Sequence, residues 1–119
     1  MEKVNLREKL LLFAEHWSPR IVGELNGQQV KLAKLLGTFD WHRHEAEDEL
    51  FLVLSGTLTL RLRSGDVVLN EGEFFIVPRG VEHQPHAEEE VHVLLFEPAS
   101  TVNTGAVRNE RTIVNPDWI

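Results

Sequence analysis

Short apolar segments separated by glycine-containing turns run through most of this chain, from Arg20 to Phe96. Asn26-Gly27 lies between two such segments, and this dipeptide is the strongest short-range signal of a β-hairpin. Residues 57–62 alternate strictly between polar residues and leucine, as in a strand with one buried face. This spacing of strands and turns predicts an all-β sandwich or barrel.

The strands are expected as one series of short pieces. Their predicted ranges are 21–25, 29–36, 39–44, 49–54, 57–62, 67–69, 74–77 and 91–96. Residues 83–86 are expected to form at most an edge strand, because Pro85 cannot donate to a ladder of hydrogen bonds. The acidic residues 87–90 are expected to form a charged turn before the last strand.

The two ends of the chain differ from this pattern. Residues 5–16 predict a short helix, with Asn5 as its N-cap and Glu8 as its capping-box partner. We therefore expect a helical arm over residues 1–18, a β-barrel domain over 19–98 and a tail over 99–119. The tail ends in Trp118 and Ile119, so we expect it to pack on the barrel or on a partner subunit.

Composition restricts the possible functions. A chain of 119 residues predicts one domain with one modest core. The net charge of −7, with no basic run, argues against nucleic acid or an anionic membrane as a partner. The apolar runs are too short to span a bilayer and the N-terminus lacks the order of a secretory signal, so a cytoplasmic protein is expected. Because cysteine is absent, any metal must be bound by nitrogen and oxygen.

Four residues make up a candidate ligand set. His42 and His44 would share one face of a strand, and Glu49 opens the next apolar run. His83 follows a Pro-x-Gly turn. Three imidazoles and one carboxylate from separate strands suit a divalent transition metal. Asp48 is a rival to Glu49, but adjacent strand residues face opposite ways, and Glu49 is preferred.

These residues belong to two motifs that resemble those of the cupin family. The first motif is carried by Gly37, His42, His44, Glu49 and Gly56, and the second by Gly72, Pro78, Gly80 and His83. Two positions depart from the usual pattern. Four residues instead of five separate Gly37 from His42, and Ala87 stands where the second motif usually closes with asparagine. Neither departure removes a ligand, so the chain resembles a small single-domain cupin.

The resemblance implies a double-stranded β-helix, or jelly-roll barrel, with one metal ion inside. It implies His42, His44, Glu49 and His83 as the ligands, with two adjacent coordination positions left open for water, substrate or dioxygen. Mn, Fe, Ni, Cu and Zn all suit this ligand set, and the sequence does not choose among them.

Neighbouring residues are assigned by their parity along the strands. Phe51 and Val53 share the face of Glu49 and are expected to line the pocket. His86 is expected to face outward. His92 is either a hydrogen-bonding or acid–base group at the pocket, or a structural histidine of the barrel whose hydrogen bonds are satisfied. Leu50, Leu52 and Leu54 point away from the pocket and must be covered by a second sheet, the helix or a second subunit, which suggests a homodimer.

Three functions are consistent with these features. The first is a metal-dependent enzyme acting on a small organic substrate, by dioxygenase-type or by isomerase or lyase chemistry. The second is a non-catalytic module that binds a metal or a small molecule, and in the third the metal only holds the strands. Small cupins are often likened to mannose-6-phosphate isomerases, but a phosphosugar would need lysine or arginine in the cavity, where the expected inward faces are apolar.

Overall fold

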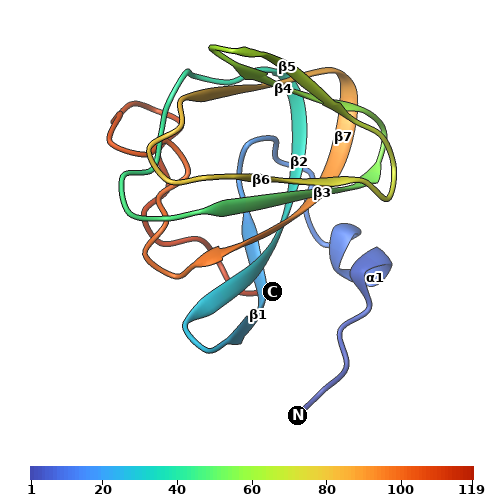
Figure 1. The fold of residues 1–119 in the computed structure, drawn as a ribbon. Helices are drawn as coiled ribbons and strands as arrows, with labels where there is room; N and C mark the ends of the chain where they lie inside the picture. The colour runs from blue at the N-terminus through green and yellow to red at the C-terminus, as the bar shows by residue number, and fades with distance from the viewer.

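The computed structural model describes all 119 residues as an all-β fold of seven antiparallel strands (Figure 1). The strands are β1 (Arg20–Leu25), β2 (Gln28–Thr38), β3 (Glu49–Ser55), β4 (Leu58–Leu62), β5 (Gly65–Leu69), β6 (Phe74–Val77) and β7 (His83–Pro98). One helix, α1 (Leu6–Leu10), precedes them. No helix of this fold is long and apolar enough to cross a membrane.

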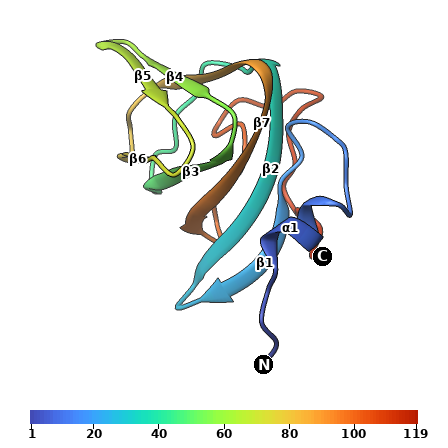
Figure 2. The ribbon, with the colours of Figure 1, turned by 90° about the vertical axis from the view of Figure 1, so that its right-hand side faces the viewer.

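Strand β7 connects the two halves of the sheet. The strands run in the order β1-β2-β7-β3-β6, and β4 pairs both with β7 and with β5. Figure 2 shows β3 to β6 on one side of the interior and β1 and β2 on the other, with β7 between them. Strands β1 and β6 end the order and do not pair with each other, so the sheet is not closed into the barrel that the sequence predicted. The arrangement is nevertheless that of a jelly roll.

The last third of the sheet differs from the prediction. Residues 83–98 form one 16-residue strand instead of an edge piece, a charged turn and a strand. The three glutamates at 88–90 lie in a bulge of β7. Leu35 of β2 pairs with Val91 and Gly37 pairs with Ala87, so these three residues lie opposite a single residue of β2. The bulge therefore absorbs the charged residues at the surface without ending the strand.

The segment 39–44 is not the regular strand that was predicted. Within it only His42 makes a bridge, to His83 of β7. This short pairing is enough to fix the segment against the inside of the fold, because the backbone N–H of each residue donates to the carbonyl of the other at 3.0 and 2.9 Å.

The predicted N-terminal helix is also shorter than expected. The Asn5 side chain caps it by accepting from the Glu8 N–H at 3.0 Å, but the helix is complete at Leu10. Beyond it, Phe13 is buried against Val22 and Leu32 on the outer face of the sheet. Placing that ring in an apolar site requires the chain to leave the helix, and so burial outweighs the helical pattern.

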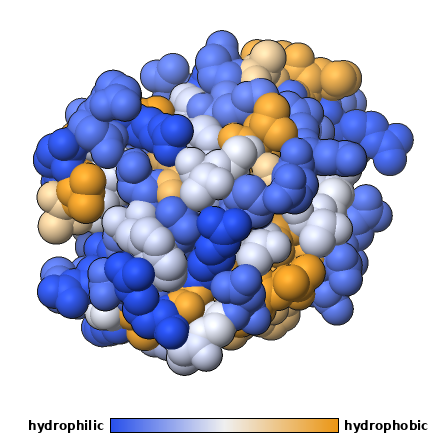
Figure 3. Space-filling view, turned by 90° about the horizontal axis from the view of Figure 1, so that it is seen from above, coloured by the Kyte–Doolittle hydropathy of each residue, from blue (hydrophilic) through white to orange (hydrophobic).

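Most of the core lies between the two halves of the sheet. A cluster of twelve buried apolar residues fills this space, and Leu58, Leu60, Val53 and Val93 are fully enclosed within it. The second, smaller cluster lies outside, under the N-terminal arm. Viewed from above, hydrophilic residues cover most of the surface, and hydrophobic residues gather near its margins (Figure 3).

The tail from Ala99 to Ile119 lies against the sheet without forming regular structure. Its last residues run beside β1, where the Ile21 N–H donates to the Asp117 carbonyl at 2.8 Å and the Ile119 N–H donates to the Ile21 carbonyl at 3.1 Å. Figure 1 shows the C-terminus ending next to β1. Ile119 packs against the outer apolar cluster.

Candidate metal centre

Three different pieces of backbone bring the four candidate ligands together. His42 and His44 lie on the segment between β2 and β3, Glu49 is the first residue of β3, and His83 is the first residue of β7. The turn before His83 is set by Gly80, whose φ of +80° suits glycine and whose N–H donates to the His44 carbonyl at 2.8 Å. The two halves of the site are therefore joined by backbone hydrogen bonds.

The donor atoms of the four side chains converge on one point. One ligand atom from each of His42, His44, Glu49 and His83 lies within 4.8 Å of all the others. The Nε2 atoms of His44 and His83 each lie 3.4 Å from Oε1 of Glu49. Ligands bound at about 2.1 Å to one ion stand roughly 3.0 to 3.5 Å apart, so these separations are close to those of a metal centre.

Hydrogen bonds fix which nitrogen of two of the rings is free. Nδ1 of His42 lies 2.8 Å from the Asp40 carbonyl, and Nδ1 of His83 lies 3.0 Å from the Val81 carbonyl. A carbonyl can only accept, so each Nδ1 carries a proton, and Nε2 is the nitrogen that a neutral ring leaves free to bind a metal. A metal-binding imidazole is usually oriented in this way.

Several of these atoms have no hydrogen-bond partner. Nε2 of His83, both ring nitrogens of His44 and Oε1 of Glu49 are buried and unpartnered. Burying such groups alone is costly, whereas one divalent ion would satisfy nitrogen and oxygen donors together. This set of unpartnered donors is the observation that best fits a bound metal.

The electrostatic environment favours the metal-binding protonation states. Burial, aided by the neighbouring His83, lowers the pKa of His42 to about 4, so its ring is neutral at pH 7. Burial alone would raise the pKa of Glu49, but its contacts with His44 and His83 outweigh this and hold the pKa well below its usual value. Glu49 is therefore a carboxylate, and the neighbouring ring of His42 is neutral.

The structure separates Glu49 from its rival. The carboxylate of Asp48 is half-exposed and accepts from the backbone N–H of Arg79 at 2.8 Å and from the Arg79 guanidinium at 3.2 and 3.3 Å. It faces away from the three imidazoles, as the alternation of strand side chains requires.

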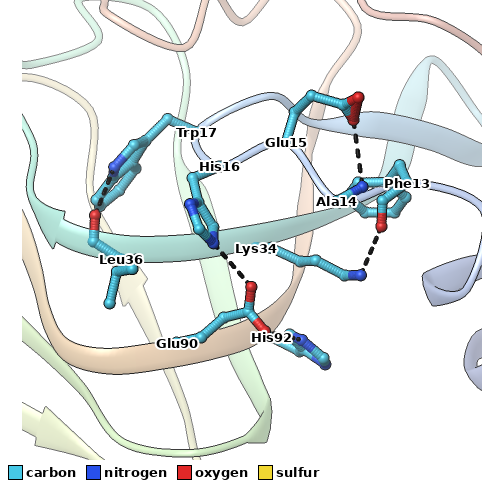
Figure 4. A network of polar contacts seen from close by, with 9 residues as sticks. All are labelled: Phe13, Ala14, Glu15, His16, Trp17, Lys34, Leu36, Glu90 and His92. Carbon is cyan, nitrogen blue, oxygen red and sulfur yellow. Dashed lines mark hydrogen bonds and ion pairs between the residues drawn. The ribbon is translucent and has the colours of Figure 1, made fainter.

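The two remaining histidines of β7 lie outside the cluster. His92 is on the outer face of the sheet, where its Nε2 lies 3.2 Å from Glu90, and Glu90 also contacts His16 of the N-terminal arm at 2.7 Å (Figure 4). The interpretation of His92 as a pocket group is therefore wrong. His86 contacts Thr38 and Glu88, each at 2.7 Å.

A narrow cavity of about 40 Å³ adjoins the cluster, and His42 and Glu49 are the two candidate ligands that line it. Trp17 of the arm and Pro116 of the tail also contribute to its wall. Phe51 lines this cavity. Val53 does not, because it is fully enclosed in the core.

The cavity wall also contains a lysine and a glutamate that were not predicted from the sequence. Lys31 of β2 and Glu97 of β7 line it, and the expectation of an entirely apolar wall was wrong. Their side chains are each only 3% exposed, and Nζ lies 3.7 Å from Oε1. The alternation of side chains along a strand could have predicted both residues. Lys31 shares the inner face of β2 with Ala33 and Leu35, and Glu97 shares the inner face of β7 with Leu95.

Fold and site together define a small jelly-roll protein with a buried cluster of three histidines and one glutamate. The family model for the Cupin_2 cupin domain matches residues 28–97, which include all four cluster residues. The chain therefore belongs to this cupin family.

Two solved structures and one curated protein are similar to this chain. The solved structure of a cupin-2 domain-containing protein from Shewanella frigidimarina is 44% identical, with a TM-score of 0.79, and the match covers 80% of this chain and 93% of that one. NMB1881 from Neisseria meningitidis is 33% identical, with a TM-score of 0.75 and coverage of 82% and 99%. The uncharacterized protein YdbB of Bacillus subtilis is 36% identical over 64 residues, which span 53% of this chain and only 57% of YdbB.

Proposed function

We propose that this cupin is a metal-dependent enzyme that acts on a small organic substrate. The observation that carries the proposal is the buried and largely unpartnered cluster of His42, His44, Glu49 and His83. Two of its members, His42 and Glu49, line an adjoining cavity. Mn, Fe, Ni, Cu and Zn all accept such nitrogen and oxygen donors. When bound, such an ion acts as a Lewis acid toward a substrate oxygen or supports oxygen-dependent chemistry.

The residues of the chain would prepare this site in three ways. The carbonyls of Asp40 and Val81 hold the rings of His42 and His83 in the tautomer that presents Nε2. Glu49 supplies the negative charge that offsets part of the charge of a divalent ion. Phe51, Val93 and Leu95 give the cavity apolar walls that exclude water and favour the hydrocarbon part of a small substrate.

Metal analysis of the untagged protein tests the first part of the proposal. We expect one transition-metal ion per chain, and we expect His42→Ala and His83→Ala to lose it. His92→Ala is the matched control, because that histidine lies on the outer face of the same strand as His83. Wild-type protein that binds no transition metal in stoichiometric amount would refute the proposal.

Activity tests the second part. Metal-loaded protein is incubated with a panel of small oxo acids, diketones and aromatic substrates, while dioxygen uptake and product formation are followed. Turnover that disappears in His42→Ala and persists in His92→Ala is the expected result. Metal binding without turnover of any substrate favours a non-catalytic binding module instead.

A further inference from the structure

A second polar group lies in the same cavity as the candidate ligands. It consists of Lys31 on β2, Glu97 on β7 and Thr101 just beyond β7, and all three line the cavity together with His42 and Glu49. Apolar side chains, among them Phe51 and Leu95, make up much of the remaining wall. The cavity wall therefore contains several polar side chains, of which only His42 and Glu49 belong to the proposed metal centre.

The members of this second group do not satisfy one another. The distance of 3.7 Å between Lys31 Nζ and Glu97 Oε1 is longer than a hydrogen bond. Oε2 of Glu97 and the hydroxyl of Thr101 are buried without a hydrogen-bond partner, and both residues are only 3% exposed. Buried polar groups are nearly always paired, so three neighbouring groups with unused capacity in a cavity wall indicate a missing partner.

A purely structural role explains the pair poorly. Lys31 and Glu97 lie on adjacent strands, so they could serve only to join β2 to β7. Those strands already pair from Gln28 with Pro98 to Thr38 with His86. A buried ion pair is in general no more stabilising than apolar residues of similar volume. An apolar pair would hold the strands equally well and would leave no unpartnered atoms.

We propose that Lys31, Glu97 and Thr101 form a subsite that binds the anionic oxygen group, such as a carboxylate, of a small substrate. In this arrangement Lys31 donates to the anionic oxygen, Thr101 donates a second hydrogen bond, and Glu97 accepts from a hydroxyl of the ligand. This inference rests on the proposed metal-dependent function, because the opposite end of the same ligand would face the four metal-binding residues.

Charge and size support this class of ligand. With a divalent ion in place, the ion and Lys31 together carry more positive charge than Glu49 offsets, and this holds even when Glu97 is ionised, so an anionic ligand offsets the remaining positive charge. Burying a charge without such compensation is costly, so an uncharged ligand of the same shape is the poorer match. The cavity of about 40 Å³ restricts the ligand to a few heavy atoms, as in a short hydroxy acid or oxo acid.

The test compares lactate with lactamide, which have nearly the same shape but differ in charge. Binding of each to the metal-loaded protein is measured by isothermal titration calorimetry for the wild type, for Lys31→Met/Glu97→Gln and for Lys34→Met. The double variant replaces both ionisable side chains at once, so the formal net charge of the protein is unchanged. Lys34 is the matched control, because it lies on the same strand and its Nζ donates to the Phe13 carbonyl on the outer face.

We expect the wild type to bind lactate more tightly than lactamide. In the double variant the ratio of the two affinities should fall at least tenfold, while the metal content stays the same. Lys34→Met should behave like the wild type. An unchanged preference in a folded, metal-loaded double variant would overturn the inference and leave the metal centre intact. A wild type without metal would instead overturn the proposed function, so the two failures are distinguishable.

A milder variant covers the case in which the double variant does not fold. Thr101→Val keeps the shape of the side chain and the Lys31–Glu97 pair but removes the hydroxyl. We expect a several-fold loss of lactate affinity with unchanged metal content and an unchanged melting temperature. Lactate affinity equal to that of the wild type would contradict the assignment of Thr101 to the subsite.

Discussion

At the scale of single residues, Gly105 occupies a position that has no room for a side chain. Its φ is +62°, and a Cβ atom would overlap the backbone oxygen of Arg43, which lies between two of the candidate ligands. We predict that Gly105→Ala separates the tail from this segment, costs more than about 2 kcal/mol of stability and weakens metal binding. Chemical denaturation and metal titration measure both effects.

Gly27→Ala is the control for this prediction. Gly27 also has a positive φ, of +77°, but an added Cβ would meet nothing within 4 Å. Only the backbone strain remains, which costs about 1 kcal/mol, and metal affinity should not change. Equal losses in the two variants would mean that the close approach to Arg43 has no role in positioning the ligands.

The two adjacent carboxylates of Asp48 and Glu49 allow a second test at this scale. Replacing groups that merely orient a ligand costs roughly 10 to 100-fold in metal affinity, so Glu49→Gln should cost more than about 100-fold. Asp48→Asn should change metal affinity little, because that side chain pairs with Arg79 outside the site. Calorimetric titration with Mn²⁺ or Ni²⁺ compares the two variants. A larger loss in Asp48→Asn would show that the wrong carboxylate has been assigned.

At the scale of elements, the N-terminal arm acts as a cover for the outer face of the sheet. Phe13 is 7% exposed and packs on Val22 and Leu32, whereas Leu11 is 82% exposed. We predict that Phe13→Ala lowers the free energy of unfolding by about 3 kcal/mol and that Leu11→Ala changes it by less than about 0.5 kcal/mol. Urea denaturation followed by tryptophan fluorescence measures both. Similar values for the two variants would show that the arm does not pack as described.

The elements also show what could be predicted from the sequence. Local patterns were sufficient where one face of a strand is buried: the predicted strand 74–77 is β6, and the hairpin at Asn26-Gly27 joins β1 to β2. They failed where distant contacts decide the structure, as in β7, which continues through Pro85 because β2 and β4 pair with it on both sides. The predicted length of the helix was wrong for the same reason, since the burial of Phe13 depends on tertiary contacts.

The candidate site divides in the same way. The four clustered side chains could be named from the sequence, because motif spacing and the parity of Glu49 both point to them. The environment of the cluster could not. Lys31 and Glu97 meet only because β2 and β7 are neighbours in the sheet, and His92 could be placed outside only once the register of β7 was known.

At the scale of the whole molecule, the cavity depends on both ends of the chain. Trp17 of the arm stacks on Phe39, with ring centroids 4.7 Å apart, and Asn109 and Arg111 of the tail donate to Asp40 and Thr38. The segment that carries His42 is thus held by contacts from both the N-terminal arm and the C-terminal tail. The arm and the tail thereby take part in shaping the pocket, although neither contributes a candidate metal ligand.

The outer face of β3 and β6 leads to a last prediction, that of a homodimer. Leu50 and Leu52 are paired in register with Ile76 and Phe74, and the two β6 residues are 48% and 60% exposed. The N-terminal arm covers Leu54 farther along β3 but leaves this patch open. Strand β6 pairs only with β3, so its free edge lies beside the patch. We propose that a second copy of the chain covers this surface, which would bury both patches by symmetry.

The dimer is tested by Phe74→Ser/Ile76→Thr. Removing one large apolar side chain from such an interface costs about 1.5 to 3 kcal/mol of dimer stability. Each substitution occurs twice in a symmetric dimer, so the dissociation constant of the dimer should rise by more than about 1,000-fold. Sedimentation analysis should give twice the chain mass of 13.6 kDa for the wild type and the single mass for the variant. Val68→Ser, which removes an exposed valine from β5, should stay dimeric. A wild type that sediments as a monomer at micromolar concentration would refute the proposed dimer, because this apolar surface would then not be covered by a second copy of the chain.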